Sequence, residues 1–277
     1  MKRRLVEGVA VREWGGLAEP GVLMWPGLGS TGGYFASVAE AMPGRAVAVD
    51  PPGFGDSPPL EPCTSERLVE LARAVISECG CRAIVGHSLG AYLAVALASD
   101  PPVELRAVVL IDGGYLRVDE MVELGQPPVS ASRSELVAWL SRHRLRFRDW
   151  DTAIQEIAAM FDSSVTPALE AYLREVLVEV NGEVRDPRSP ERMADLLVAA
   201  RSRDTPALAH QIAVPTLLIA CAKQPEHREL RQTAWQRFAD ASPQIQLHVA
   251  ETWSHNPIME APVASANLIA DWLRAHL

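Results

Sequence analysis

One stretch in the first half of the chain, residues 82–93, constrains the fold more than any other. The apolar run 83–85 is bounded by turn-forming residues, which is typical of a fully buried strand. The pentapeptide at 86–90, Gly-His-Ser-Leu-Gly, follows it, and small residues then favour a helix over 91–99. Glycines allow strand and helix to pass closely, while the residue at the apex takes a strained backbone geometry. This turn therefore predicts that Ser88 lies at the positive amino-terminal end of a helix.

Strands and helices alternate on both sides of this turn. Strands are expected at 22–25, 46–49, 107–111, 214–220 and 246–249, with one or two edge strands in 6–14. Helices are expected at 34–42, 64–79, 230–239 and 264–276. Such an alternation implies crossover connections and a mainly parallel sheet.

The alternation stops between residues 115 and 210. Helical spacing is expected there over 133–147, 150–161, 167–178 and 190–202, with one hairpin signal at 180–184. We therefore expect residues 1–114 and 211–277 to form one α/β core. Residues 115–210 are expected to be a helical cap inserted after the strand that ends at Asp112.

Composition narrows the possible partners. A chain of 277 residues can bury a sizeable core, and its net charge of −9 disfavours nucleic acid and anionic membrane surfaces. The basic start of the chain is followed by no apolar signal region, and no apolar run approaches the length of a membrane span. Four scattered cysteines lack histidines at ligand spacing, so we expect free thiols, no metal site and a cytoplasmic protein.

Four pieces of sequence, taken in chain order, resemble the α/β-hydrolases. They are Pro-Gly-Leu-Gly at 26–29, Asp-Pro-Pro-Gly-Phe-Gly-Asp-Ser at 50–57, the pentapeptide at 86–90, and Ser-His-Asn-Pro-Ile-Met-Glu-Ala-Pro at 254–262. The resemblance covers nearly the whole chain outside the cap. It implies the α/β-hydrolase fold, a mainly parallel twisted sheet flanked by helices. It also implies a serine hydrolase without a cofactor that cleaves a carboxylic ester or related acyl bond of a small molecule; the oligomeric state stays open.

Ser88 is the candidate nucleophile in this resemblance. A serine hydroxyl needs an adjacent base to remove its proton, and an imidazole has a suitable pKa. His255, on the loop after the last strand, is the candidate base. His87 is expected to be structural, with its side chain directed away from that of Ser88.

The resemblance also implies an oxyanion hole built from backbone N–H groups. Two such donors stabilise the negative charge that develops on the substrate oxygen. They are expected at Leu28 and at Leu89, the residue after the nucleophile. The family usually has His-Gly before the first of these positions, whereas this chain has Pro-Gly at 26–27.

The acid that would assist His255 is not at its usual place. The family most often has an Asp shortly after the strand at 216–220, a position that falls near Gln224. A glutamine cannot compensate an imidazolium charge. Asp112 and Glu226 could substitute, and both preserve the order Ser, acid, His. We favour Asp112, because a lone carboxylate at the tip of a buried strand needs a partner.

Other features have weaker functional implications. Residues 50–57 are expected to shape one side of the pocket through tight turns, with Asp50 bonded to local backbone. The basic segment 142–148 is expected to spread its charges around a solvated helix, and a role in binding a substrate carboxylate is less favoured. Candidates for an apolar pocket lining are Trp25, Tyr34, Trp150 and Trp253.

The same residues allow several alternative functions. Gly-Leu-Gly-Ser-Thr-Gly at 27–32 fits a dinucleotide-binding turn, with Asp50 as its ribose acid, but that hypothesis leaves Ser88 and His255 unexplained. A non-catalytic ligand-binding hydrolase fold would account for the missing acid near Gln224. Thioesterases, lactonases, acyltransferases and cofactor-free C–C hydrolases use the same residues and stay open. Dehalogenases and epoxide hydrolases carry Asp in place of Ser88 and are disfavoured.

Overall fold

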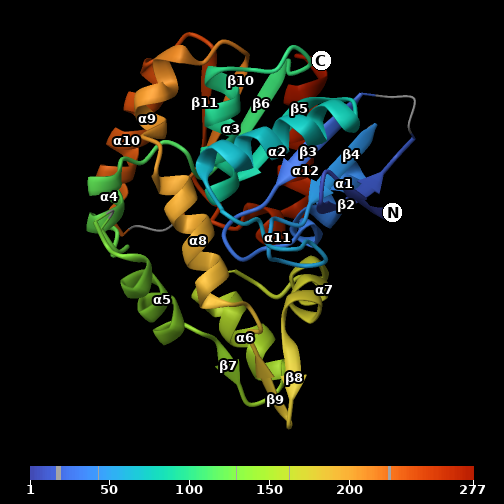
Figure 1. Cartoon of the computed structure of the whole chain (residues 1–277), viewed down its shortest axis with the longest axis vertical. Coiled ribbons are helices and arrows are strands. Elements are labelled where there is room, and N and C mark those ends of the chain that lie inside the picture. The colour runs from blue at the N-terminus through green and yellow to red at the C-terminus, as the bar shows by residue number, and fades with distance from the viewer. Residues whose placement is uncertain (17–19, 43, 129, 162, 224–225) are drawn as a thin grey trace.

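The protein is described by a computed structural model that covers residues 1–16, 20–42, 44–128, 130–161, 163–223 and 226–277. An eight-stranded sheet runs through it in the spatial order β1-β2-β4-β3-β5-β6-β10-β11 (Figure 1). Its strands are β1 (Lys2–Val6), β2 (Val9–Trp14), β3 (Gly21–Trp25), β4 (Arg45–Val49), β5 (Cys81–His87), β6 (Ala107–Ile111), β10 (Thr216–Cys221) and β11 (Ile245–Ala250). β2 pairs antiparallel with β1 and with β4, whereas the neighbours in the row β4-β3-β5-β6-β10-β11 are all parallel, so the expected mainly parallel sheet is confirmed.

Helices cover both faces of this sheet and bury its strands. One apolar cluster packs α2 (Ser65–Glu78), α3 (Leu89–Ser99) and α10 (Arg228–Asp240) against one face. A second cluster packs η1 (Gly32–Phe35), α1 (Ala36–Ala41) and α12 (Pro262–Arg274) against the other face. Strands β3, β4 and β6 are buried along their whole length, and β5 is buried except at Arg82, as their near-continuous apolar sequences require.

Residues 115–210, called the cap segment below, connect β6 to β10. Most of the segment extends beyond the carboxyl ends of the parallel strands, at the lower end of Figure 1. Its elements are α4 (Val118–Glu123), α5 (Arg133–Arg142), β7 (Arg146–Phe147), α6 (Trp150–Met160), α7 (Pro167–Val176), β8 (Val178–Val180), β9 (Glu183–Arg185) and α8 (Pro190–Arg201). The chain then returns through α9 (Thr205–Leu208) and η2 (Ala209–Gln211), which pack on α3.

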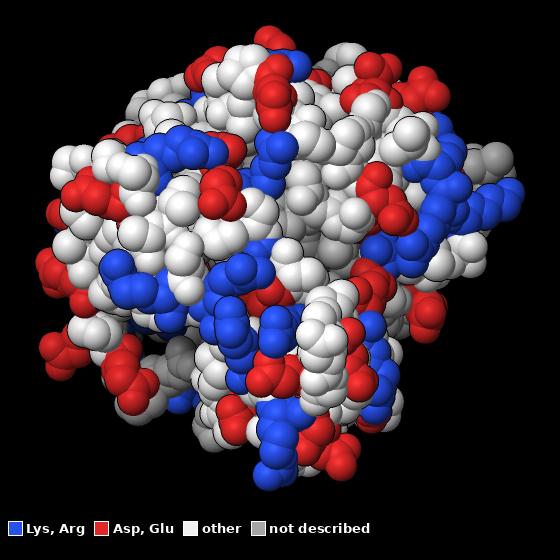
Figure 2. Space-filling view, turned by 60° about the horizontal axis from the view of Figure 1, so that its bottom comes forward, with Lys and Arg blue, Asp and Glu red and all other residues white. Residues whose placement is uncertain are grey.

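The basic segment 142–148 differs from the sequence prediction. The expected helix over 133–147 ends at Arg142, and β7 follows as a short strand. Leu145 and Phe147 turn inward while the arginines between and around them stay exposed, a period of two that favours a strand over a helix. Positive and negative side chains are interspersed over this end of the molecule, as Figure 2 shows. Arg148 pairs with Asp149 at 2.8 Å, which fits a solvated surface.

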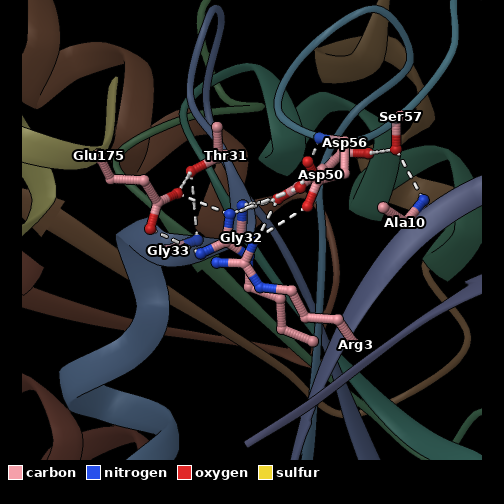
Figure 3. Close-up of polar contacts among 10 residues, drawn as sticks. Arg3, Ala10, Thr31, Gly32, Gly33, Asp50, Asp56, Ser57 and Glu175 are labelled. Atoms are coloured by element: carbon pink, nitrogen blue, oxygen red, sulfur yellow. Dashed lines mark hydrogen bonds and ion pairs between the residues drawn. The ribbon is translucent and has the colours of Figure 1, made fainter. Parts of the chain in front are cut away.

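A charged link joins the cap segment to the sheet. Arg12 on β2 is buried and donates two hydrogen bonds to Glu175 on α7, at 2.7 and 2.6 Å. Thr31 also donates to Glu175 at 2.6 Å (Figure 3). Asp50 accepts from Arg12 and from the backbone N–H groups of Gly32 and Asp56, so its carboxylate is bonded to backbone as expected. The link fixes α7 next to the loop that follows β3.

Candidate active site

Ser88 occupies the sharp turn between β5 and α3. Its φ of 51° and ψ of −115° are strained for a residue with a side chain, at a cost of about 1–3 kcal/mol. A Cβ atom on Gly86 would lie 2.4 Å from the carbonyl oxygen of Gly90, and one on Gly90 would lie 2.1 Å from the carbonyl oxygen of Trp25. Side chains are therefore excluded at both glycines, and the close crossing of strand and helix holds Ser88 at the start of α3.

Three side chains form a hydrogen-bonded line at this turn. His255 follows β11, on the loop before α11 (Pro257–Glu260), and its Nε2 lies 3.0 Å from Ser88 Oγ. Its Nδ1 lies 2.7 Å from Asp112 Oδ2. Because the carboxylate can only accept, Nδ1–H donates to Asp112 and leaves the lone pair of Nε2 free to accept from the Ser88 hydroxyl.

Asp112 is held by donors on several elements. It ends β6 with a φ of 43°, and its side chain is fully buried. Besides His255, it accepts from Arg231 Nη2 at 2.7 and 2.8 Å, Tyr115 Oη at 3.0 Å and the N–H of Cys221 at 3.3 Å. Burial acts to raise the pKa of Asp112, but the bond to His255 and the charge of Arg231 outweigh it and hold the pKa well below its usual range. The carboxylate is therefore ionised at neutral pH.

Glu226, the alternative candidate for the acid, is not the hydrogen-bond partner of His255. Glu226 is exposed, and the carboxylate that approaches His255 is that of Asp112. Gln224, near the usual position of the acid, lies outside the described residues. Arg231 on α10 was missed from the sequence, because its helix has the polar composition of an ordinary surface helix.

Two cavities meet at Ser88. The larger, of about 300 Å³, lies against the cap segment, which lines it with mainly apolar side chains together with Tyr172 and Arg188. The smaller, of about 150 Å³, lies between α3, α4 and α8. Leu28, Ser88 and His255 line both cavities. The apolar residues that the cap contributes to the larger one are Leu145, Ile157, Phe161, Leu169, Leu173, Val176 and Leu177.

The fold agrees with a comparison of the sequence with known families. The sequence model of the alpha/beta hydrolase family matches residues 22–268. The chain belongs to this family. A curated relative from Enterobacter cloacae, RutD, is named for carbamate hydrolysis and is 34% identical over 100 residues. That match covers 34% of this chain and only 38% of RutD.

Solved structures of other alpha/beta hydrolases superpose on nearly the whole chain. E-2-(acetamidomethylene)succinate hydrolase has a TM-score of 0.77 at 20% identity and covers 99% of both chains. The thioesterase domain from the curacin biosynthetic pathway has a TM-score of 0.69 at 24% identity over 97% of both chains. An enol-lactonase from Burkholderia xenovorans LB400 has a TM-score of 0.65 at 18% identity, over 99% of this chain and 100% of that one. At these identities the likeness concerns the fold.

Leu28 and Leu89 are the residues whose backbone N–H groups were predicted to form the oxyanion hole. Both line the smaller cavity beside Ser88. Leu89 is the first residue of α3, so its N–H has no partner within the helix. Within the described part of the chain, neither amide donates a hydrogen bond to another residue. Both N–H groups are therefore available to a ligand atom.

His87 is placed differently from the prediction. Its side chain lines the larger cavity together with Ser88, rather than being directed away from it. The ring stacks on Tyr34 at 4.6 Å, and its Nε2 donates to the carbonyl oxygen of His255 at 2.8 Å. Burial, with a smaller effect from His255, lowers the pKa of His87 to about 3. A neutral His87 thus supports the loop that carries His255.

Of the four aromatic residues predicted to line the pocket, one does so and three do not. Tyr34 lines the larger cavity. The prediction is wrong for Trp25, Trp150 and Trp253, none of which lines either cavity. Trp25 is buried in the core, Trp150 packs beneath Arg174 at 4.9 Å, and Trp253 lies beside the ring of His248. An aromatic residue type predicts burial, but the face of the helix or strand on which it lies decides whether it packs in the core or lines a cavity.

Other expectations concern metals, membranes and nucleotides. Across the described ranges, no group of three or more His, Cys, Asp or Glu side chains could hold a metal ion, and no helix has the length and apolarity of a membrane span. All four cysteines are free. Asp50, the residue that a dinucleotide-binding turn would use for ribose, is buried and bonded to Arg12 and backbone.

Proposed function

We propose that the protein is a serine hydrolase that cleaves a carboxylic ester or related acyl bond of a small molecule through an acyl-enzyme. The observation that carries this proposal is the line of hydrogen bonds from Asp112 through His255 to Ser88, at 2.7 and 3.0 Å. Membership of the alpha/beta hydrolase family supports it. Ester, lactone and thioester substrates all present a carbonyl carbon to the serine, so the proposal covers acyl bonds as a class.

Each side chain of the line has a distinct part in the proposed reaction. Ser88 Oγ attacks the carbonyl carbon while His255 Nε2 takes the hydroxyl proton, and Asp112 stabilises the resulting imidazolium. The N–H groups of Leu28 and Leu89 would hold the oxygen that becomes negative. When the intermediate collapses, His255 gives its proton to the leaving group. Water, activated by His255, then attacks the acyl-enzyme and releases the acid and Ser88.

Labelling with a fluorophosphonate tests this function. Wild-type protein should be labelled at Ser88 and should hydrolyse short p-nitrophenyl esters. The variant Ser88→Ala should lose the label and about 10⁶-fold in kcat/KM, as when a triad nucleophile is removed. Ser99→Ala is the matched control, because Ser99 ends the same helix and, among the described residues, its hydroxyl bonds only to the carbonyl oxygen of Ala96. A wild-type serine that is never labelled would overturn the proposal and favour a ligand-binding hydrolase fold.

A further inference from the structure

Arg201, the last residue of α8, is a buried cation without an acidic partner. The residue is only 8% exposed, and no Asp or Glu in the described part of the chain forms an ion pair with it. Its Nη1 donates to the carbonyl oxygen of Pro127 at 2.7 Å and its Nη2 to Gln126 Oε1 at 2.5 Å. Its Nε is buried and has no partner. The charge therefore meets only neutral acceptors.

Other arginines with little exposure are compensated. Each has a carboxylate oxygen within 3.2 Å: Arg12 with Asp50, Arg45 with Glu13, Arg188 with Asp186, and Arg231 with Asp112. Leaving a buried charge unpaired is costly, so this one exception among them needs an explanation. A negatively charged ligand that pairs with Arg201 would explain why the protein itself provides no acidic partner.

The surroundings of Arg201 provide further donors. Arg201, Tyr92 and Gln126 line the smaller cavity, the one that also reaches Ser88. Burial raises the pKa of Tyr92, so its hydroxyl stays protonated. Within the part of the chain that the structure describes, this hydroxyl makes only a 3.8 Å contact with the sulfur of Met121. Gln126 uses its oxygen to accept from Arg201, which leaves its N–H₂ group to donate. The cavity thus offers a cation and two neutral donors.

One carboxylate also lines the cavity, and it does not neutralise Arg201. Asp112 already accepts hydrogen bonds from His255, Arg231 and Tyr115 and from the backbone N–H of Cys221. Its side chain is fully buried behind these donors. The positive charge in the cavity is therefore available to a ligand.

We propose that the smaller cavity binds a carboxylate of the substrate, paired with Arg201 and completed by hydrogen bonds from Tyr92 and Gln126. The planar guanidinium matches the two oxygens of a carboxylate. A cavity of about 150 Å³ that shares Ser88 with the larger one accepts a short fragment, so the carboxylate lies a few bonds from the scissile carbonyl. This inference rests on the proposed function and makes its substrate an acyl compound with a nearby negative charge.

Pairs of esters of similar size test the inference. Monomethyl succinate and methyl butyrate place the carboxylate, or a methyl group, on the acyl side; 3-acetoxypropionate and propyl acetate do so on the alcohol side. For one of the two pairs, wild-type kcat/KM should be at least about tenfold higher for the anion. The variant Arg201→Gln should lose about 10²-fold or more on that anion, as when one partner of a buried charge pair is truncated. Its activity on the neutral ester should stay near the wild-type value, and Arg201→Lys should recover part of the preference.

Arg192→Gln is the matched control. Arg192 lies on the same helix, at its exposed side, and pairs with Glu61 at 2.8 Å. Both members of each ester pair should be hydrolysed by this variant as by the wild type. If Arg201 serves packing alone, Arg201→Gln should lower the melting temperature and slow both members of a pair equally, which would overturn the inference.

Binding to an inactive variant separates this inference from the proposed function. Calorimetric titration of Ser88→Ala with monomethyl succinate and with 3-acetoxypropionate should detect binding of at least one, and the added change Arg201→Gln should abolish it. Binding that survives the second change, or no binding of either anion to Ser88→Ala, would overturn the carboxylate site. Absence of fluorophosphonate labelling in the wild type would overturn the hydrolase function and leave the binding result standing.

Discussion

The two sides of the space around Ser88 are built in different ways. The core side consists of Ser88, Asp112 and His255, which follow the parallel strands β5, β6 and β11 at the same edge of the sheet. The cap side consists of apolar side chains from α6 and α7 at the larger cavity and from α8 at the smaller one. Its helix α7 meets the core through the ion pair Arg12–Glu175. We expect the reacting groups to lie on the core side, whereas the cap side contributes most of the apolar surface of the larger cavity.

The core side and the cap side also differ in how many hydrogen bonds hold their key carboxylates. Asp112 is oriented by four donors from different parts of the fold. Glu175 connects α7 to the core through Arg12 and Thr31. We therefore expect changes on the core side to act on the chemical step, and changes on the cap side to act on substrate affinity. The first and third of the following predictions test this division, and the second tests the burial of His87 on the core side.

The largest effect is expected at the acid. Asp112→Asn keeps the size of the side chain but removes the charge that stabilises the imidazolium and selects the His255 tautomer. The value of kcat should fall about 10⁴-fold, as for other replacements of a triad acid, with a much smaller change in KM. Steady-state kinetics on a p-nitrophenyl ester measure both constants.

Glu226→Gln is the control for this prediction. The residue is exposed, and its replacement should leave kcat unchanged. A large loss in Glu226→Gln together with full activity in Asp112→Asn would transfer the acid role to Glu226 and contradict the division.

A second effect, on stability, is expected at His87 on the core side. The unfolded ring binds a proton near pH 6.5, whereas the folded ring has a pKa of about 3. Because the unfolded state binds the proton first, stability should fall as the pH decreases through this window, by about 1.4 kcal/mol per pH unit. In His87→Asn this contribution should disappear. Urea unfolding at pH 6.5, 5.5 and 4.5 gives the slope.

An exposed histidine provides the comparison. His210→Asn, on η2, should leave the slope between pH 6.5 and 4.5 as in the wild type. Equal slopes in wild type and His87→Asn would show that the buried ring does not resist protonation.

The smallest effect is expected on the cap side, at Glu175. Glu175→Gln removes the charge that pairs with buried Arg12, at a cost of about 1–3 kcal/mol for charge-assisted hydrogen bonds. Since α7 lines the larger cavity, KM should rise several-fold while kcat stays close to the wild-type value. Urea unfolding and steady-state kinetics measure the two parts.

Glu170→Gln on the same helix is its matched control. Glu170 forms only an exposed pair with Arg174, so the change should cost less than about 0.5 kcal/mol and leave KM unaltered. A fall in kcat rather than a rise in KM in Glu175→Gln would erase the distinction between the two sides.

The sequence predicted the core better than the surfaces around the site. The buried strands and the turn at Ser88 have local sequence signals, namely apolar runs ended by glycine. These signals were sufficient to predict the elements and their order along the chain. The partner of His255 was a choice between Asp112 and Glu226, because loop geometry decides which carboxylate reaches the ring. Arg231 gave no signal, since its pairing with Asp112 joins residues 119 apart in sequence.

The cap segment shows why such predictions weaken away from the sheet. Residues 142–148 contain charges that fit a helix face or one side of a strand equally well, and only packing of Phe147 selected the strand. Trp25, Trp150 and Trp253 were assigned by residue type alone. Arg201 looked like an ordinary basic residue at a helix end, and its missing partner became visible only from its surroundings.

The meeting of two cavities at Ser88 has a kinetic consequence for the proposed reaction. The two halves of a substrate would occupy separate compartments, so the first product can depart while the acyl half stays bound on the opposite side of the serine. The compartment that it leaves becomes the entrance for the second nucleophile. The size and polarity of that entrance would set how the acyl-enzyme partitions between water and a competing alcohol, and thereby whether the protein acts mainly in hydrolysis or in transfer.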